Sequence, residues 1–217
     1  MNSIRVNRRG ALVAAAIAIP ALMPWGRAFA GTNTSPQAAI GKAAPAFEVI
    51  DAAKNKRSLA EFKGKTVVLE WTSPSCPFAK AQYDSGRMQA LQKWSTKNGM
   101  VWLSVLSSHP SRSDYLEPAK AETFNRTRGA SPTALLIDAS GDVGLAYGAK
   151  TANHMFVVSG SGVLIYAGGI DDGDSMDAKK VLHAHNYVRA ALDDVLAGRA
   201  VKVPTTVPSG CALAYAG

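Results

Sequence analysis

One short segment constrains the fold of this chain more than any other. The run TVVLEW at residues 66–71 is almost continuously apolar, which is the pattern of a parallel strand buried on both faces. A short turn follows, then Cys76, and then Pro77 at the start of a long stretch with helical spacing. A strand that is buried on both faces needs layers of other elements above and below it. The segment therefore predicts an α/β protein with this strand inside the sheet.

The other elements are expected in a regular order along the chain. A hairpin-like start is predicted from residue 47, in FEVIDAAKNKRSL, and Ser140-Gly141-Asp142 is typical of a turn. Helical spacing indicates helices near residues 117–127 and across 180–197. Further strands are predicted at MVWLSVLSS (100–108), ALLID (134–138), MFVVS (155–159) and GVLIYAGG (162–169), the last two joined as a hairpin. This order predicts a three-layer α/β sandwich around a central mixed β-sheet.

The chain divides into four parts by composition. Its 217 residues suit one domain with appendages. We expect a signal peptide at residues 1–30, a flexible polar leader at 31–40, the folded domain at 41–200 and a tail at 201–217. The tail, VKVPTTVPSGCALAYAG, is rich in proline and glycine and carries Cys211, so we expect it to be irregular and flexible.

The first 30 residues have the pattern of an export signal. The basic start MNSIRVNRRG precedes the apolar run ALVAAAIAIPALM, which is too short to span a bilayer comfortably. Ala28-Phe29-Ala30 fits a cleavage site, so we expect a periplasmic product that begins at Gly31 and is not inserted in a membrane. Arg8-Arg9 is compatible with a twin-arginine signal, and an ordinary Sec signal explains the segment equally well. An uncleaved membrane anchor remains an alternative.

Charge and motif content argue against several function classes. The formal net charge is +8, but residues 1–30 hold four of the 24 basic residues and no acidic ones, and the rest has a net charge of +4. No basic block or basic–aromatic alternation remains there, so we expect no nucleic-acid partner. The sequence also lacks a phosphate-binding loop and a ligand cluster with metal-site spacing, so we expect no cofactor and no metal.

Cys76 is the residue whose position most clearly indicates chemistry. Proline is favoured at the first position of a helix, so Pro77 makes Cys76 the expected N-cap. There the sulfur faces free backbone N–H groups and the positive end of the helix dipole, which both favour the reactive thiolate. Lys80, one turn on, could add a positive charge. The alternative is a buried, inert cysteine.

The same stretch, VVLEWTSPSCPFAK, resembles the active-site segment of the thioredoxin-like redoxin family related to peroxiredoxins, the AhpC/TSA type with a CPF motif. The segment GAKTANHMFVVSGSGVLIYAGGIDD and the chain's ending are similar to the same group, so the likeness covers roughly residues 41–217. The resemblance implies a thioredoxin-like fold and thiol redox chemistry in which Cys76 is the nucleophile.

The chain departs from the pattern of that family at four positions. Thioredoxins have a second cysteine where this chain has Ala79, and peroxiredoxins have threonine and proline where it has Ser73 and Leu69. The hydroxyl of Ser73 could replace that of the threonine. Asn153 stands where a thioredoxin fold has a cis-proline, and a cis bond at another residue costs about 3 kcal/mol. We therefore expect an altered loop there, which also bears on how a substrate docks.

Two further residues are candidates for proton transfer. The resemblance suggests that Glu70, in the first buried strand, moves protons for Cys76, and burial would raise the pKa of such a carboxyl. The alternative is an acid that reaches solvent or a lysine partner. His154 would act as a base or hydrogen-bond donor toward the sulfur, or it is a structural histidine.

These observations lead to two hypotheses about function. The first is an exported thiol-dependent oxidoreductase that reduces a peroxide or exchanges with a protein disulfide through Cys76, with a partner protein or small thiol as reductant and with a homodimer as one possible state. The second is a non-catalytic binding or chaperone module on the same fold. Because Ala79 leaves Cys76 without a local partner, we predict that Cys211 resolves its oxidised form, within one chain or across a dimer. The alternatives are a permanent structural bond to Cys76 and an unpaired Cys211.

Overall fold

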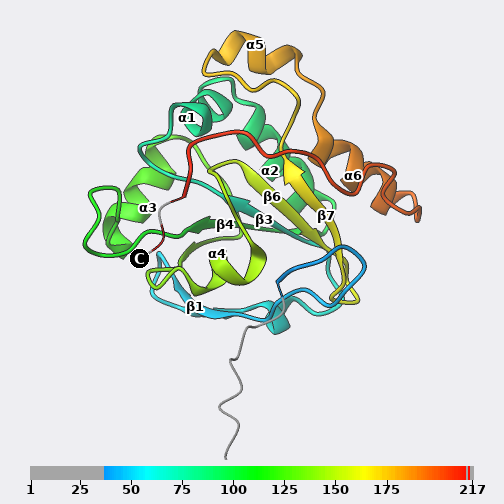
Figure 1. Cartoon of the computed structure of the whole chain (residues 1–217), viewed down its shortest axis with the longest axis horizontal. Helices are drawn as coiled ribbons and strands as arrows, with labels where there is room; N and C mark the ends of the chain where they lie inside the picture. The colour runs from blue at the N-terminus through cyan, green and yellow to red at the C-terminus, as the bar shows by residue number, and fades with distance from the viewer. Residues whose placement is uncertain (1–36, 214, 216–217) are drawn as a thin grey trace, which may run out of the picture. The chain divides into compact units, whose positions relative to one another are not determined.

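A seven-stranded mixed sheet forms the centre of the folded unit (Figure 1). The computed structural model describes residues 37–213 and 215, so the expected signal peptide and most of the expected leader lie outside the described residues. The spatial order of the strands is β2-β1-β5-β4-β3-β6-β7. β3, β4 and β5 are parallel, and every other neighbouring pair is antiparallel. The strands are β1 (Glu48–Asp51), β2 (Lys56–Ser58), β3 (Val67–Trp71), β4 (Val101–Leu106), β5 (Ala134–Ile137), β6 (His154–Val158) and β7 (Leu164–Gly169).

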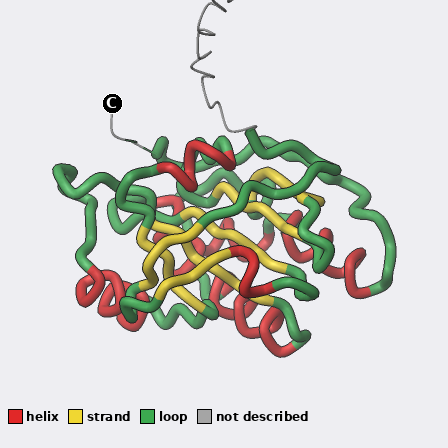
Figure 2. Tube along the Cα trace, turned by 90° about the horizontal axis from the view of Figure 1, so that it is seen from below, coloured by secondary structure: helices red, strands yellow, loops and turns green. Residues whose placement is uncertain are grey.

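Helices lie on both sides of this sheet, as Figure 2 shows from below. The predicted three-layer α/β arrangement is therefore confirmed. Within residues 37–213, none of the helices combines the length and the hydrophobicity that a membrane span requires. The helices are η1 (Leu59–Phe62, a 3-10 helix), α1 (Pro77–Asp84), α2 (Arg87–Lys97), α3 (Pro118–Thr127), α4 (Asp142–Tyr147), α5 (Ala178–His183) and α6 (Tyr187–Leu196).

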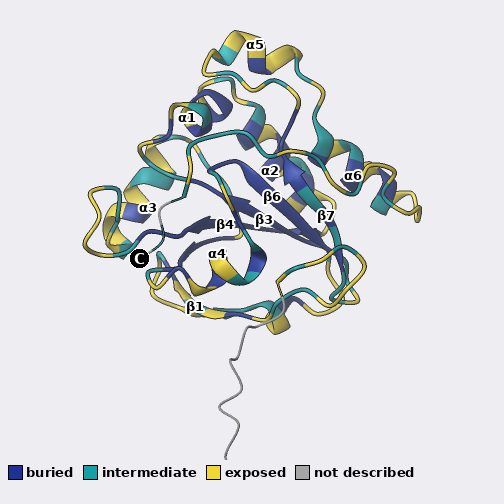
Figure 3. Ribbon diagram, in the orientation of Figure 1, coloured by how far each residue is buried: buried dark blue, intermediate teal, exposed yellow. Residues whose placement is uncertain are grey.

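The central strand β3 separates two apolar cores. All five of its residues are buried, as the apolar run predicts (Figure 3). Leu69 and Trp71 pack on the α4 side, in the same cluster as Tyr147. Val68 points to the other face, where its cluster includes Met88 of α2 and Leu192 of α6. Successive side chains of β3 thus pack into the two cores in alternation, which is why this strand has no solvent-exposed face.

Two local predictions differ from the structure, and one helix is absent from the prediction. The long helix expected after Cys76 is two helices, because Gly86 adopts a left-handed φ of 78° between α1 and α2. The helix expected across residues 180–197 is also two, α5 and α6, and the side chain of Asn186 caps α6. The turn predicted at residues 140–142 leads into α4, whose amides at Val143 and Gly144 donate to the buried carboxylate of Asp138.

The C-terminal tail is irregular, as predicted, but it is seated on the domain rather than free. In Figure 1 it runs from α6 back across the ends of β7 and β6 toward α1. Thr205 forms a bridge with Ala167 of β7, and Ala212 forms one with Thr151, just before β6. The tail therefore connects two places on the sheet that lie far from it in the sequence.

Candidate active site

The turn after β3 places Cys76 at the start of α1. The hydroxyl of Ser73 accepts a hydrogen bond from the amide of Ser75 at 3.4 Å, and the carbonyl of Ser73 accepts one from the amide of Cys76 at 3.4 Å. Cys76 has extended backbone angles and Pro77 occupies the first turn of the helix. Cys76 is thus the N-cap of α1, as the sequence predicts.

Cys76 forms a disulfide bond with Cys211 of the same chain. The two residues are 135 positions apart, and their Cα atoms lie 5.6 Å apart. Cys76 is 1% exposed and packs with Ala79 and Ala152. The structure contradicts the unpaired alternative for Cys211. The resolving and the permanent structural roles both require this bond, so the bond itself does not separate them.

The tail pairs with the backbone beside the disulfide. The amide of Ala152 donates to the carbonyl of Cys211 at 2.9 Å, and the amide of Leu213 donates to the carbonyl of Lys150 at 2.9 Å. These two bonds lie on the two sides of Ala212, which forms an antiparallel bridge with Thr151. The Cys211 backbone is therefore held as a short added strand, and its sulfur lies against the N-terminus of α1.

The loop before β6 turns at Asn153 through a left-handed backbone conformation and not through a cis peptide bond. All peptide bonds among the described residues are trans, and Asn153 has a left-handed φ of 69°, which asparagine tolerates better than most residues. Its amide donates to the carbonyl of Trp71 at 2.7 Å, and its side-chain oxygen is buried without a protein partner. The expected alteration of the loop is therefore a left-handed residue at the position of the family's proline.

Lys80 and Ser73 engage neighbours other than the sulfur of Cys76. The exposed Lys80 forms an i,i+4 ion pair with Asp84, so its charge is offset there. The hydroxyl of Ser73 lies 3.1 Å from that of Ser75 and shapes the turn. Among the described residues, neither side chain is therefore bonded to the sulfur of Cys76.

Glu70 lies at the centre of a buried hydrogen-bond network. Its carboxylate is fully buried and accepts hydrogen bonds from the hydroxyl of Tyr83 at 2.7 Å and the indole of Trp102 at 2.7 Å. Gln92 and Ser104 donate two more, at 3.0 and 2.8 Å. Burial, together with the Glu70 charge, raises the pKa of Tyr83 well above its usual range. Glu70 is thus linked to α1 by its hydrogen bond with Tyr83. Within the described residues, Cys76 is not a hydrogen-bond partner of Glu70.

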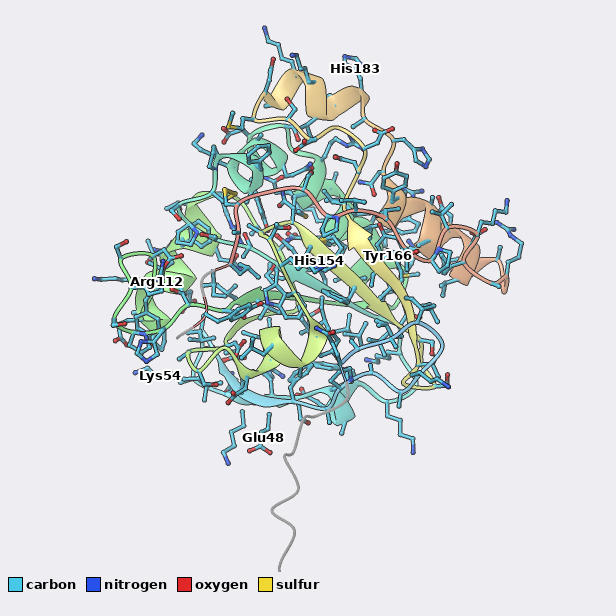
Figure 4. All side chains as sticks on the ribbon, viewed as in Figure 1. Glu48, Lys54, Arg112, His154, Tyr166 and His183 are labelled. Carbon is cyan, nitrogen blue, oxygen red and sulfur yellow. A yellow bond between two sulfur atoms is a disulfide. The ribbon has the colours of Figure 1, made fainter. Side chains whose placement is uncertain are left out.

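His154 is held as a neutral, buried ring. Figure 4 places it within the body of the domain, at the start of β6. Its Nδ1 accepts a hydrogen bond from the amide of Lys150 at 3.2 Å, and its ring packs 4.3 Å from that of Phe156. Burial, with a smaller effect from the Lys150 charge, lowers the pKa of His154 to about 4. These contacts order the loop on which Cys211 pairs.

Arg128 is a residue near the site that sequence reasoning missed. Its guanidinium stacks 3.8 Å above the ring of Tyr83 and 4.0 Å from that of Phe124, and it donates to the hydroxyl of Thr72 at 2.9 Å. It also borders a recess of about 270 Å³ beside the Cys76 turn, together with Ser73, Pro74, Lys80, Asp84 and Thr127. No sequence signal points to Arg128, because it follows α3 and reaches the turn only through folding.

Solved structures of other proteins have a similar fold. A hypothetical protein from Sinorhizobium meliloti 1021 is similar, with a TM-score of 0.69, 27% identity, and coverage of 84% of this chain and 98% of that chain. An uncharacterized conserved protein from Geobacillus kaustophilus matches with a TM-score of 0.69, 23% identity, and coverage of 85% and 94%. A search of curated proteins gave no match.

A family model matches the chain over residues 40–167, more than half of its length, and that model describes the AhpC/TSA family. The matched segment includes β3, the Cys76 turn and the loop of Asn153. The resemblance stated from the CPF segment is thereby confirmed, as is the thioredoxin-like α/β fold. The chain belongs to the AhpC/TSA family of thioredoxin-like redoxins.

Proposed function

We propose that this protein is a thiol–disulfide oxidoreductase in which Cys76 attacks the substrate and Cys211 resolves the product. One observation carries the proposal: the two cysteines close a disulfide at the N-terminus of α1, where Cys76 is the N-cap. Amides in the first turn of a helix have no acceptor within the helix, so they favour a negative charge on the sulfur beside them. Cys211 lies in an irregular segment without a helix start. This asymmetry assigns the attack to Cys76.

The reaction has two steps and moves two electrons. The Cys76 thiolate attacks one sulfur of a substrate disulfide, forms a mixed disulfide and expels the other substrate sulfur as a thiolate, which takes up a proton. Cys211 then loses its proton to solvent and attacks the Cys76 sulfur, which forms the Cys76–Cys211 bond and expels the second substrate sulfur. The substrate becomes a dithiol and the protein ends as the disulfide. A thiol reductant, either a partner protein or a small thiol, returns the protein to its dithiol state.

A peroxide is the second candidate substrate, favoured by membership of the AhpC/TSA family. Cys76 would then become a sulfenic acid as the peroxide is reduced to water or an alcohol, and Cys211 would condense with it and release water. The Ser73 hydroxyl, the expected counterpart of the peroxiredoxin threonine, contacts Ser75 instead. Disulfide exchange is therefore the better supported reaction.

Export to an oxidising compartment is part of this proposal. Residues 1–30 have the pattern of a signal peptide, and a disulfide persists in a periplasm far better than in a cytosol. We keep the domain limits proposed from the sequence, with the folded part at 41–200 and the tail at 201–217; the last helix, α6, ends at Leu196. N-terminal sequencing of the purified protein tests the cleavage after Ala30, and retention of Met1 would contradict it.

The function is tested by offering a disulfide-bonded peptide and hydrogen peroxide separately to the reduced full-length chain. We expect the peptide to yield the Cys76–Cys211 bond and two thiols. Cys76→Ser should abolish this, whereas Cys211→Ser should stop at the mixed disulfide. We also expect Cys76 to be alkylated with an apparent pKa below about 8.5, the value of a free cysteine.

Three outcomes would contradict the proposal. Faster oxidation of Cys76 by hydrogen peroxide than by the peptide would favour the peroxidase. A Cys76–Cys211 bond that survives strong reductant would make the bond structural. A reduced Cys76 that reacts with neither substrate nor alkylating probe would favour the non-catalytic binding module.

A further inference from the structure

Residues 210–213 and Tyr215 lie on a surface, which we call the seat, formed by two glycines at the start of α4 and by backbone groups of residues 149–152. Gly210 has a φ of 143°, and a side chain at that position would collide with the carbonyl of Ala152. At the start of α4, side chains at the N-cap Gly141 or at Gly144 would collide with the ring of Tyr215. The hydroxyl of Tyr215 donates to the carbonyl of Ala149 at 2.6 Å. We call residues 210–213 and Tyr215 the distal segment.

A second part of the tail is held independently of the cysteines. We call residues 204–206 the proximal segment, which lies along β7. The carbonyl of Pro204 accepts from the amide of Ala167 at 3.0 Å, and the amide of Thr206 donates to the carbonyl of Ala167 at 3.3 Å. The hydroxyl of Thr206 accepts from the amide of Gly169 at 2.9 Å and lies 2.7 Å from that of Tyr166. This part of the tail therefore does not need the disulfide to stay in place.

The two segments are joined by residues 207–209, which are partly exposed. Val207 is 86% exposed, and Pro208 and Ser209 are half-buried. Apart from the disulfide, the distal segment is held by the bonds of Cys211, Leu213 and Tyr215 to residues 149–152 and by partly buried apolar contact of Leu213. When the disulfide is broken, the distal segment can regain backbone entropy by leaving the seat. This gain in entropy opposes the few hydrogen bonds that hold the segment in place. Residues 207–209 would act as the hinge about which the distal segment moves away from the seat.

We propose that reduction of the Cys76–Cys211 bond releases the distal segment, and that the vacated seat binds an extended polypeptide whose cysteine is preceded by glycine and followed four residues later by tyrosine. This inference rests on the proposed function and names its substrate class. The bound tail is the template, because Gly210, Cys211 and Tyr215 occupy the seat in that order. The vacated amide of Ala152 and carbonyl of Lys150 pair with the backbone of such a polypeptide and place its sulfur against Cys76. A small-molecule disulfide has no backbone to make these bonds.

The first test measures release by amide hydrogen exchange in the full-length chain. We expect the amide of Leu213 to exchange at least tenfold faster in the reduced protein than in the oxidised protein. The amide of Thr206, in the proximal segment, should change less than twofold and serves as the internal control. Equal protection of Leu213 in both states would overturn the proposed release.

The second test measures binding to the seat. The probe is a fluorescent peptide, VPSGSALAY, which copies residues 207–215 with serine in place of cysteine, so that only non-covalent binding is read. Because the tethered tail competes with it, the full-length variant Gly210→Ala is used to displace the tail, with Ser209→Ala as the matched control. We expect the reduced Gly210→Ala chain to bind the peptide at least tenfold more tightly than the reduced Ser209→Ala chain, and the oxidised wild type to show no binding.

Specificity is read with two altered peptides, one with alanine for the glycine and one with alanine for the tyrosine. We expect each to bind at least tenfold more weakly to the reduced Gly210→Ala chain. Equal binding of all three peptides, or binding that is the same in the oxidised wild type, would overturn the proposed seat.

These results are separable from the test of the function. Exchange of Cys76 with a small disulfide, without release of Leu213 or binding of the peptide, would leave the function standing and overturn this inference. Release and peptide binding by a chain whose Cys76 is unreactive would support the seat and contradict the function.

Discussion

At the scale of single residues, the burial of His154 is a source of pH dependence. Its pKa is lowered to about 4 by burial, so the folded state holds it neutral where an unfolded chain, with a pKa near 6.5, would protonate it. The unfolded state therefore binds more protons between about pH 6.5 and 4, and stability falls as the pH is lowered through that window. The lowered pKa of His154 corresponds to a loss of about 3 kcal/mol in the free energy of unfolding once the pH has fallen to about 4.

We predict that His154→Asn flattens this part of the pH profile, because the titrating ring is removed while a hydrogen-bond acceptor for Lys150 is retained. The measurement is the free energy of unfolding in urea at several pH values between 4 and 7. His183→Asn is the matched control, because His183 is exposed on α5 (Figure 4). The same acid-dependent loss in wild type and His154→Asn would contradict the assignment.

Glu70 is the second residue whose surroundings define a test. Four donors surround its carboxylate, so Glu70→Gln turns an amide N–H₂ group toward at least one of them. We expect the free energy of unfolding to fall by about 1–3 kcal/mol. The resemblance to thioredoxins predicts, in addition, slower thiol chemistry.

The alkylation rate of Cys76 against pH in Glu70→Gln decides between the two roles. The network reaches α1 through Tyr83, and we expect the pH profile to stay unchanged while the stability drops. A slowed reaction with a shifted pH profile would instead show that Glu70 moves protons for Cys76.

At the scale of elements, Gly86 separates α1 from α2. Its φ is 78°, and a side chain there would meet nothing within 4 Å, so the conformation alone requires glycine. We predict that Gly86→Ala lowers the free energy of unfolding by about 1–2 kcal/mol, the cost of a left-handed residue. Gly86→Asn is the matched control and should cost less, because asparagine adopts this conformation more readily. Equal stability of Gly86→Ala and wild type in urea would be inconsistent with this account.

At the scale of the whole molecule, the disulfide ties the start of α1 to the end of the chain. Closing a loop of this length restricts the unfolded chain, and such a bond stabilises a fold by about 2–5 kcal/mol. We predict that reduction lowers the thermal midpoint of the full-length protein by about 5–15 °C. Calorimetry with and without reductant measures this, and Cys211→Ser should show the lower midpoint in both conditions. A midpoint that does not respond to reductant in the wild type would mean that the tail contributes nothing through this bond.

The sequence alone determined much of the order and chemistry of the elements. The apolar run TVVLEW indicated β3, and Pro77 indicated the start of α1 with Cys76 as its cap. These features depend on local backbone preferences and on the side-chain pattern within one element, and both can be read along the chain. The same reasoning missed the break at Gly86 and the helix α4, because a glycine in a polar stretch is compatible with several backbone conformations.

Only the tertiary structure decided how distant residues meet. The sequence predicts the pairing of Cys76 with Cys211 but leaves an unpaired Cys211 open; the bond across 135 positions depends on the path of the tail over β7 and the loop before β6. The partners of Glu70 come from two helices and a neighbouring strand, and Arg128 reaches the Cys76 turn from the end of α3. Contacts of this kind are set by the order and register of strands in the sheet and by packing between its layers. The residue pattern within one segment does not show which distant segment will pack against it. Such contacts can therefore be seen only in the folded structure.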